Sequence, residues 1–354
     1  MIPAFEGRAK TRTLLSLSMA IACLIFDHLP AFGSTAGGRA LDAAGDPSAR
    51  EFNRTDPSPN RANLQKSLRV ITKTPHPMGS PEQQRLARWM LGLLRAWGWK
   101  SEEQTFTVKV PFGISAAKGL VQRTGRNVIG WRAGIDPCVY IVGGHYDSKF
   151  FPQGVHFVGA NDGGSSTALM LELSRLWTHP EHALKAGQKS AGRWLDCDVV
   201  LAFFDGEEAF LPDWVDGEKY FGMRDNLYGS REFVNRLERR AAALLWKKKP
   251  VRLFLNLDMV GHKNQNLFIT EGSDSILSEQ FISLRGTVPL KQVPLTVEDD
   301  HVPFRKLGIP FIHIIDWTNL QEWHTPQDNL DIVSPEKIAD LAQVVMKFSE
   351  RKRP

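Results

Sequence analysis

The stretch CVYIVGGHYDSK (138–149) is followed, after a short connection, by GANDGGSSTALMLELSRLW (159–177). Residues 138–143 are continuously apolar, which is typical of a strand buried on both faces of its sheet. A polar, glycine-containing turn at 161–164 leads into a helix predicted over 165–177. This order predicts one repeating unit of an α/β sheet, with polar side chains placed where the strand ends.

The same alternation extends outward in both directions. A helix predicted over 81–97 has Ser80 as its N-cap, Pro81 in its first turn and Gly98 as its stop signal. Further strands are predicted at 105–110, 127–130, 199–204, 253–259 and 310–315, and further helices at 65–71, 230–245 and 335–348. The chain is therefore predicted to form one catalytic α/β domain over 61–354, with a mostly parallel, twisted central sheet flanked by helices.

The first 60 residues differ in composition from the rest. Three basic residues between 8 and 12 precede an apolar run at 14–26, and small residues follow up to Ala36. This order predicts a secretory signal peptide over 1–33, with a flexible leader over 34–60. We expect export and no stable membrane span after cleavage, and the alternative is an uncleaved N-terminal membrane anchor.

Charge and cysteine content narrow the classes of protein further. The 354 residues include 42% hydrophobic and 23% charged residues, which is ordinary for a soluble domain. A net charge of +5 with scattered basic residues argues against a nucleic-acid partner. Beyond the signal, Cys138 and Cys197 remain. They either pair in an oxidising compartment or stay as buried free thiols.

Acids and histidines recur at or after the carboxyl ends of four of the predicted strands. Asp162 follows the first quoted strand, the pair Glu207 and Glu208 follows the strand at 199–204, Asp258 lies in the strand at 253–259, and His324 comes after the strand at 310–315. Burying so many carboxylates without a cation would cost several kcal/mol for each of them. A divalent cation removes this cost, and zinc suits a mixture of imidazole and carboxylate ligands.

These segments resemble a known superfamily. The chain resembles the zinc aminopeptidase superfamily in five segments, which are HYDS (145–148), NDGG (161–164), DGEE (205–208), LDMVG (257–261) and WHT (323–325). Within this superfamily, the chain resembles the animal-type glutaminyl cyclases, or glutaminyl-peptide cyclotransferases. The segments that carry this closer resemblance are HYDSK (145–149), FFDGEEAF (203–210), LYGSR (227–231) and EDDHVPF (298–304). The resemblance runs from about Met78 to the C-terminal helix and implies the fold of that superfamily.

The resemblance also implies roles for individual residues. It implies zinc ligation by Asp162, Glu208 and His324, general acid–base catalysis by Glu207, and substrate-holding acids at Asp258 and Asp299. Substrate contacts are implied for Trp323, for Trp214 by a looser match, and for Glu298, which replaces an expected Gln. His145 and Asp147 are candidates for a second metal site or for supporting the ligands. Gly144 and Thr167 stand where animal enzymes have a disulfide, and Asn319 stands where an aromatic residue is expected.

Two functions are consistent with these residues. The first is zinc-dependent cyclisation of an N-terminal glutamine of peptides or proteins to pyroglutamate, with release of ammonia and one zinc ion per site. The alternative is a two-zinc aminopeptidase, because His145 and Asp258 stand where a second zinc would bind and Asp162 would bridge both ions. Three protein ligands leave an open position on zinc, as a catalytic site requires.

Overall fold

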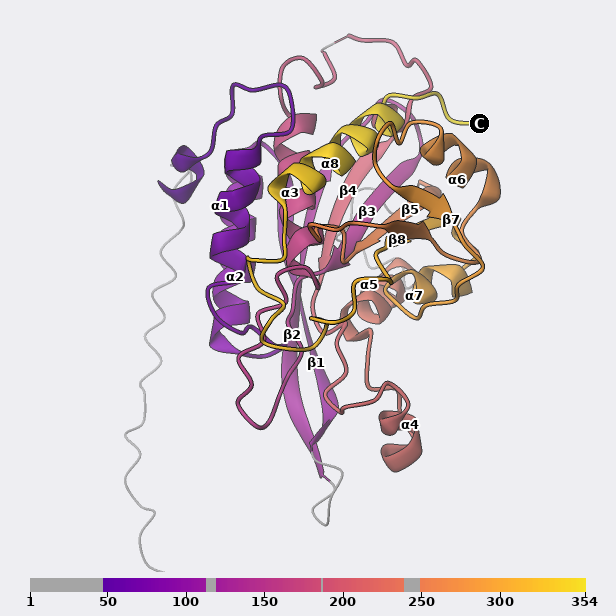
Figure 1. Cartoon of the computed structure of the whole chain (residues 1–354). Helices are drawn as coiled ribbons and strands as arrows, with labels where there is room; N and C mark the ends of the chain where they lie inside the picture. The colour runs from indigo at the N-terminus through magenta and orange to yellow at the C-terminus, as the bar shows by residue number, and fades with distance from the viewer. Residues whose placement is uncertain (1–46, 113–118, 186, 239–248) are drawn as a thin grey trace, which may run out of the picture. The chain divides into compact units, whose positions relative to one another are not determined.

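The computed structural model describes residues 47–112, 119–185, 187–238 and 249–354, so the predicted signal peptide lies outside the described residues. Within them, the strands form one eight-stranded sheet in the order β1-β2-β4-β3-β5-β8-β6-β7 (Figure 1). The strands are β1 (Lys100–Phe112), β2 (Gly119–Arg132), β3 (Val139–His145), β4 (Asp198–Phe204), β5 (Val251–Asp258), β6 (Leu267–Ile269), β7 (Leu290–Gln292) and β8 (Phe311–Ile315). This confirms the α/β fold class.

The centre of the sheet is parallel. Strand β3 pairs in parallel with both β4 and β5, and β5 pairs in parallel with β8. The outer pairs β1–β2, β2–β4 and β6–β8 are antiparallel. In the ladder, His145 lies opposite Phe204, and Asp258 lies opposite Ile315. The carboxyl ends of four parallel strands therefore meet at one edge, which is where ligands bind in such sheets.

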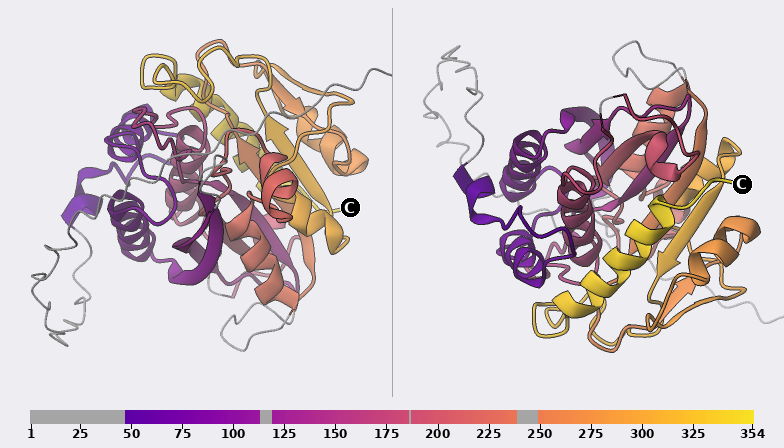
Figure 2. Two further views of the ribbon diagram at one scale, coloured as in Figure 1. Left: turned by 90° about the horizontal axis from the view of Figure 1, so that it is seen from below. Right: turned by 90° about the horizontal axis from the view of Figure 1, so that it is seen from above.

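Helices cover both faces of the sheet (Figure 2). The helices are α1 (Arg61–Ile71), α2 (Pro81–Ala96), α3 (Gly164–Trp177), α4 (Asp216–Phe221), α5 (Tyr228–Glu238), α6 (Ser275–Ile282), α7 (His301–Lys306) and α8 (Pro335–Ser349), with 3-10 turns η1 (Pro47–Glu51) and η2 (Trp194–Asp196). The larger apolar cluster joins α1, α2, α3 and α8 to one face. On the other face, Phe233 of α5 and Phe304 of α7 pack on Phe204 and Phe254, and the Phe254 and Phe304 rings stack at 3.9 Å.

Local signals placed helix α2 well, whereas the strands predicted at 105–110 and 127–130 cover only part of β1 and β2. The Ser80 side chain accepts a hydrogen bond from the Gln83 amide at 3.1 Å, so α2 begins as predicted. Helix α1 begins four residues earlier than predicted, because Asn60 caps it through the Asn63 amide. Strands β6 and β7 have three residues each and were not predicted, since so short a segment carries no measurable periodicity.

Part of the segment assigned to a leader packs on the domain. Phe52 is buried and its ring meets Trp97 edge-on, with the centroids 5.5 Å apart. The buried Arg175 donates hydrogen bonds to the carbonyl oxygens of Asp56 and Ser58. The packed part of the chain therefore begins before residue 61.

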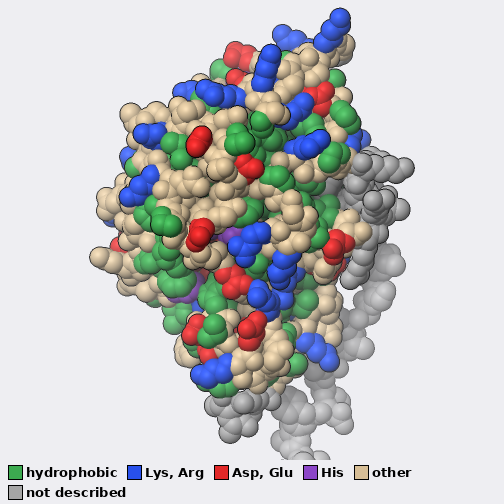
Figure 3. All heavy atoms as spheres, turned by 90° about the vertical axis from the view of Figure 1, so that its right-hand side faces the viewer, with side chains coloured by type: hydrophobic (Ala, Val, Ile, Leu, Met, Phe, Trp, Pro, Cys, Tyr) green, Lys and Arg blue, Asp and Glu red, His purple; other side chains and the backbone are tan. Residues whose placement is uncertain are grey.

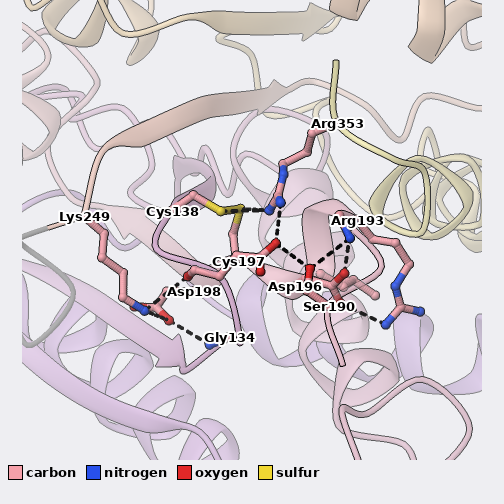
Figure 4. Close-up of a disulfide and its surroundings, with 12 residues drawn as sticks. Gly134, Cys138, Ser190, Arg193, Asp196, Cys197, Asp198, Lys249 and Arg353 are labelled. Atoms are coloured by element: carbon pink, nitrogen blue, oxygen red, sulfur yellow. Dashed lines mark hydrogen bonds and ion pairs between the residues drawn. A yellow bond between two sulfur atoms is a disulfide. The ribbon is translucent and has the colours of Figure 1, made fainter. Parts of the chain in front are cut away.

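A disulfide joins Cys138 and Cys197, which resolves the two alternatives for these cysteines in favour of pairing (Figure 4). The two residues directly precede β3 and β4, at the end of the sheet opposite the acidic strand ends. The Arg353 guanidinium lies 2.8 and 2.7 Å from the two sulfur atoms and pairs with Asp136. The C-terminal segment is thereby tied to the disulfide.

Two further features concern the length of the helices and the charge of the surface. Every helix among the described residues is too short or too polar to cross a membrane. On the side of the fold that carries α6 and α7, basic and acidic side chains are interspersed (Figure 3).

Candidate metal centre and active site

Three predicted ligands converge at the carboxyl edge of the sheet. His324 Nε2 lies 3.1 Å from Glu208 Oε1 and 3.5 Å from Asp162 Oδ2. One donor atom from each of the three residues lies within 4.8 Å of the others. The Asp162 Oδ2 and Glu208 Oε2 atoms are buried and accept no hydrogen bond. Buried carboxylate oxygens without donors are costly, so this donor set fits a divalent cation.

A second cluster shares Asp162. His145 Nε2 lies 3.1 Å from Asp162 Oδ1 and 3.2 Å from Asp258 Oδ1. Asp147 has a supporting position instead, because its Oδ1 accepts a hydrogen bond from the Glu207 amide at 3.1 Å. The backbone carbonyl of Asp147 lies 3.1 Å from His145 Nδ1. The structure thus brings His145 into a candidate second metal site and leaves the Asp147 side chain outside both clusters.

The turn after β4 directs two adjacent glutamates into one cavity. Gly206 has a φ of +73°, and a Cβ there would lie 2.4 Å from Met78 Sδ, so glycine is required. The carbonyl oxygens of Gly206 and Glu207 accept hydrogen bonds from the amides of Tyr228 and Leu227, which fix the turn on α5.

Backbone strain gathers at the same place. Among the described residues, the non-glycine residues with positive φ are Leu227 (52°), Met259 (50°) and His324 (57°). Leu227 hydrogen-bonds to the turn at Glu207, Met259 directly follows Asp258, and His324 is itself a candidate ligand. Such conformations cost about 1–3 kcal/mol each and persist where surrounding contacts enforce them, typically at functional sites.

The acids in the cavity have different proton affinities. Burial, aided by the charges of Asp299 and Glu208, raises the pKa of Glu207 well above its usual range, although His145 opposes the shift. Burial likewise raises the pKa of Asp258 to about 6, against the hydrogen bond from His145. Burial also acts to raise the pKa of Asp299, but its pairing with His313 prevails and lowers that pKa to about 2. The site therefore places a glutamate with an increased proton affinity beside an aspartate with a decreased one.

An aromatic pocket of about 240 Å³ opens onto these groups. Its walls include Trp214, the residue of the loose match, and Trp317, which the sequence did not single out. Trp323 stacks on His324 with ring centroids 3.8 Å apart and meets Trp317 edge-on at 5.6 Å. The other lining residues are Asp162, Glu207, Glu208, Asp258, Thr296, Val297, Glu298, Asp299 and Ile315.

Glu298 and Asn319, two of the departures from the family pattern, occupy different positions. Glu298 is exposed at the pocket rim, where its Oε1 lies 2.5 Å from Arg224 Nη1. The Asn319 side-chain amide donates to Asp316 Oδ2 at 2.7 Å and does not line the pocket. Asn319 therefore shapes the loop after β8, and the aromatic wall on this side comes from Trp317 and Trp323.

Several supporting residues were not given roles from sequence. His313 Nε2 lies 2.8 Å from Asp299 Oδ2, and Asn256 donates to the same oxygen at 2.7 Å. The Asp328 carboxylate accepts hydrogen bonds from the backbone amides of Asn161 and Asp162 and so holds the loop that carries the candidate ligand Asp162. A histidine between Ile312 and Ile314 in an apolar strand is a signal that could have revealed His313, whereas Asp328 has no local signal.

Lys149 is a buried cation beside the ligands. It is 4% exposed, and its Nζ lies 2.9 Å from the Ala209 carbonyl oxygen and 3.6 Å from Glu208 Oε2. A charge in this position offsets part of the carboxylate charge and holds Glu208 toward His324. Lys149 is part of the HYDSK motif, but the motif alone did not indicate its contact with Glu208.

Comparisons with known proteins agree with this geometry. Peptidase family M28 matches residues 127–349. A glutaminyl-peptide cyclotransferase of Bothrops jararaca is 30% identical over 274 residues, covering 71% of this chain and 70% of the relative. The crystal structure of an Acidobacteriales bacterium glutaminyl cyclase is 26% identical, with a TM-score of 0.64 over 82% of this chain and 94% of the other. That of Macrostomum lignano glutaminyl cyclase shares the fold at 20% identity, with a TM-score of 0.65 over 88% and 94% of the chains. The chain therefore belongs to peptidase family M28 and, within it, to the glutaminyl-peptide cyclotransferases.

Proposed function

We propose that the protein is a zinc-dependent enzyme that cyclises the N-terminal glutamine of peptides or proteins to pyroglutamate and releases ammonia. The observation that carries the proposal is the joining of two features in one cavity. A three-residue donor set lies at the base of a tryptophan-walled pocket, and a buried glutamate with a raised pKa lies beside it. The pocket's size suits one amino-acid side chain, and its apolar walls exclude water, which would otherwise hydrolyse the amide.

Asp162, Glu208 and His324 would hold the zinc ion, since their unsatisfied buried oxygens and imidazole suit it. When bound, zinc supplies Lewis-acid polarisation of the substrate's side-chain carbonyl. Lys149 keeps the Glu208 carboxylate in place for this role.

The remaining steps belong to the chain's own acids. Asp258 and Asp299 border the pocket and would bind the substrate's α-amine. Glu207 would take a proton from that amine as its nitrogen bonds to the side-chain carbonyl carbon, and would return the proton to the amide nitrogen as ammonia leaves. Nucleophile and carbonyl belong to one residue, so the pocket need only hold the side chain in its folded conformation.

A second candidate function is that of a two-zinc aminopeptidase. The cluster of His145, Asp162 and Asp258 favours it, because Asp162 lies between both donor sets. The similarity to named glutaminyl-peptide cyclotransferases supports the first candidate.

Metal dependence is tested on the purified protein. We expect His324→Ala to lose bound zinc, measured by elemental analysis, together with turnover of a Gln-initiated peptide. Chelation of the wild type should abolish turnover, and added zinc should restore it. Full turnover by a preparation shown to be metal-free would refute the zinc dependence.

We further propose that the chain is exported. The segment 1–33 has the composition of a signal peptide, and the Cys138–Cys197 disulfide is of a kind that persists in oxidising compartments. Retention through an uncleaved N-terminal anchor is the alternative.

A further inference from the structure

A second hollow, of about 430 Å³, lies beside the pocket between β1 and α5. Lys109 of β1, Arg224, and Arg231 of α5 contribute its cations. Arg224 also contacts the rim of the first pocket, because its Nη1 lies 2.5 Å from Oε1 of the rim residue Glu298. The linings of the two hollows therefore meet at this glutamate–arginine pair.

Two of the charged groups in the hollow are already neutralised within the fold. Arg224 pairs with Glu298 and also with Glu218 of α4, whose Oε1 lies 3.4 Å from Arg224 Nε. Glu232, the acid in the hollow, pairs with Arg236 at 2.8 Å. Their net contribution to the charge of the hollow is small.

The other two cations, Lys109 and Arg231, make different contacts. Arg231 donates to the carbonyl oxygens of Leu227 and Asn226, and its guanidinium lies 4.9 Å from the centre of the Tyr228 ring. Lys109 is exposed on β1. In the described part of the chain, neither Lys109 nor Arg231 forms an ion pair with a carboxylate. The hollow thus contains one positive charge held by backbone hydrogen bonds and one that is exposed.

We propose that this hollow, the distal subsite formed by Lys109 and Arg231, binds an acidic side chain of the peptide substrate a few positions after the N-terminal glutamine. The inference rests on the proposed function. A peptide whose first residue fills the aromatic pocket must leave past its rim, and each extended residue advances it by about 3.3–3.6 Å. A chain that crosses the Glu298–Arg224 pair enters the distal subsite, where a carboxylate supplies the missing counter-charge.

The test compares substrates that differ in one charge. Each peptide begins with glutamine and continues with alanines, except for one Asp, Asn or Lys at position three, four or five. The value of kcat/KM is measured for each peptide. At the position that reaches the subsite, we expect Asp to exceed Lys by about three- to tenfold, the size of effect of two partly exposed ion pairs. The ratio should fall toward one in about 0.5 M NaCl, because salt screens exposed charges.

Two variants in one strand provide the matched control. Lys109→Glu should remove or reverse the preference, whereas Lys100→Glu makes the same charge change at the far end of β1 and should keep it. Equal kcat/KM for the Asp and Lys peptides at all three positions, while the Asn peptides are cyclised, would overturn the distal subsite alone. Failure to cyclise any of these peptides would contradict the proposed function as well.

Discussion

At the residue scale, Glu207 and Glu208 differ in what surrounds them, although they are neighbours in sequence. Glu208 lies 3.1 Å from His324 in the donor set, whereas burial raises the pKa of Glu207. We expect Glu207→Gln to keep bound zinc and lose about 10²- to 10⁴-fold in kcat, since glutamine cannot transfer the proton. Glu208→Gln should instead weaken zinc binding. Metal content and kcat of both variants check this, and zinc loss confined to Glu207→Gln would reverse the two roles.

If His324 is a zinc ligand, as proposed, zinc binding will depend on pH. Burial alone would lower its pKa, but Glu208 and Asp162 raise it to about 9 in the metal-free protein. Zinc binds the neutral imidazole, so binding must displace a proton at any pH below about 9. We therefore expect zinc affinity to rise from pH ~6 to ~9, by at most about tenfold per pH unit for this proton, and then to level off. Competition with a chelator of known pH-dependent affinity measures it, and an affinity that falls with rising pH would be inconsistent with these contacts.

The grouping of candidate site residues was predictable where a motif contains them. All three candidate ligands and the pocket residue Trp323 stand in motifs, and the structure brings them together. His313 and Asp328 act through contacts with residues distant in sequence, so a single sequence does not reveal them.

At the scale of elements, the disulfide connects the beginnings of β3 and β4 across 59 residues of sequence. Removing it frees a long loop in the unfolded chain, which costs about 4 kcal/mol of unfolding free energy in the chain-entropy estimate. We expect the double variant Cys138→Ser and Cys197→Ser to unfold at lower urea concentration. Near-normal kcat is expected at 25 °C, because the site lies at the opposite edge of the sheet. The reduced wild type serves as control, and unchanged stability would contradict a stabilising role.

The buried central strands and the capped helix α2 were predictable, whereas the long antiparallel strands β1 and β2 were predicted only in part. The continuous apolar strands and the capped helix α2 carry strong local signals, and they appear where predicted. Helices α4 and α7 have six residues each and depend on tertiary contacts, such as the stacking of Phe304 on Phe254.

At the scale of the whole molecule, export is the first prediction. The small-residue stretch between Ala31 and Ala36 is the expected cleavage region. N-terminal sequencing of protein recovered from an exporting host should find a new start there. Recovery of soluble protein with Met1 intact would reject cleavage, and membrane-bound protein with Met1 intact would favour the anchored alternative.

The central claim concerns the reaction itself and is tested by one measurement on the wild-type enzyme. Purified protein is incubated with two peptides that differ only in their first residue, glutamine or leucine, and the products are identified by mass spectrometry. Cyclisation predicts that the glutamine peptide loses ammonia and keeps all its residues, while the leucine peptide stays unchanged. Release of free leucine, with the glutamine peptide neither cyclised nor deaminated, would contradict the account and identify an aminopeptidase.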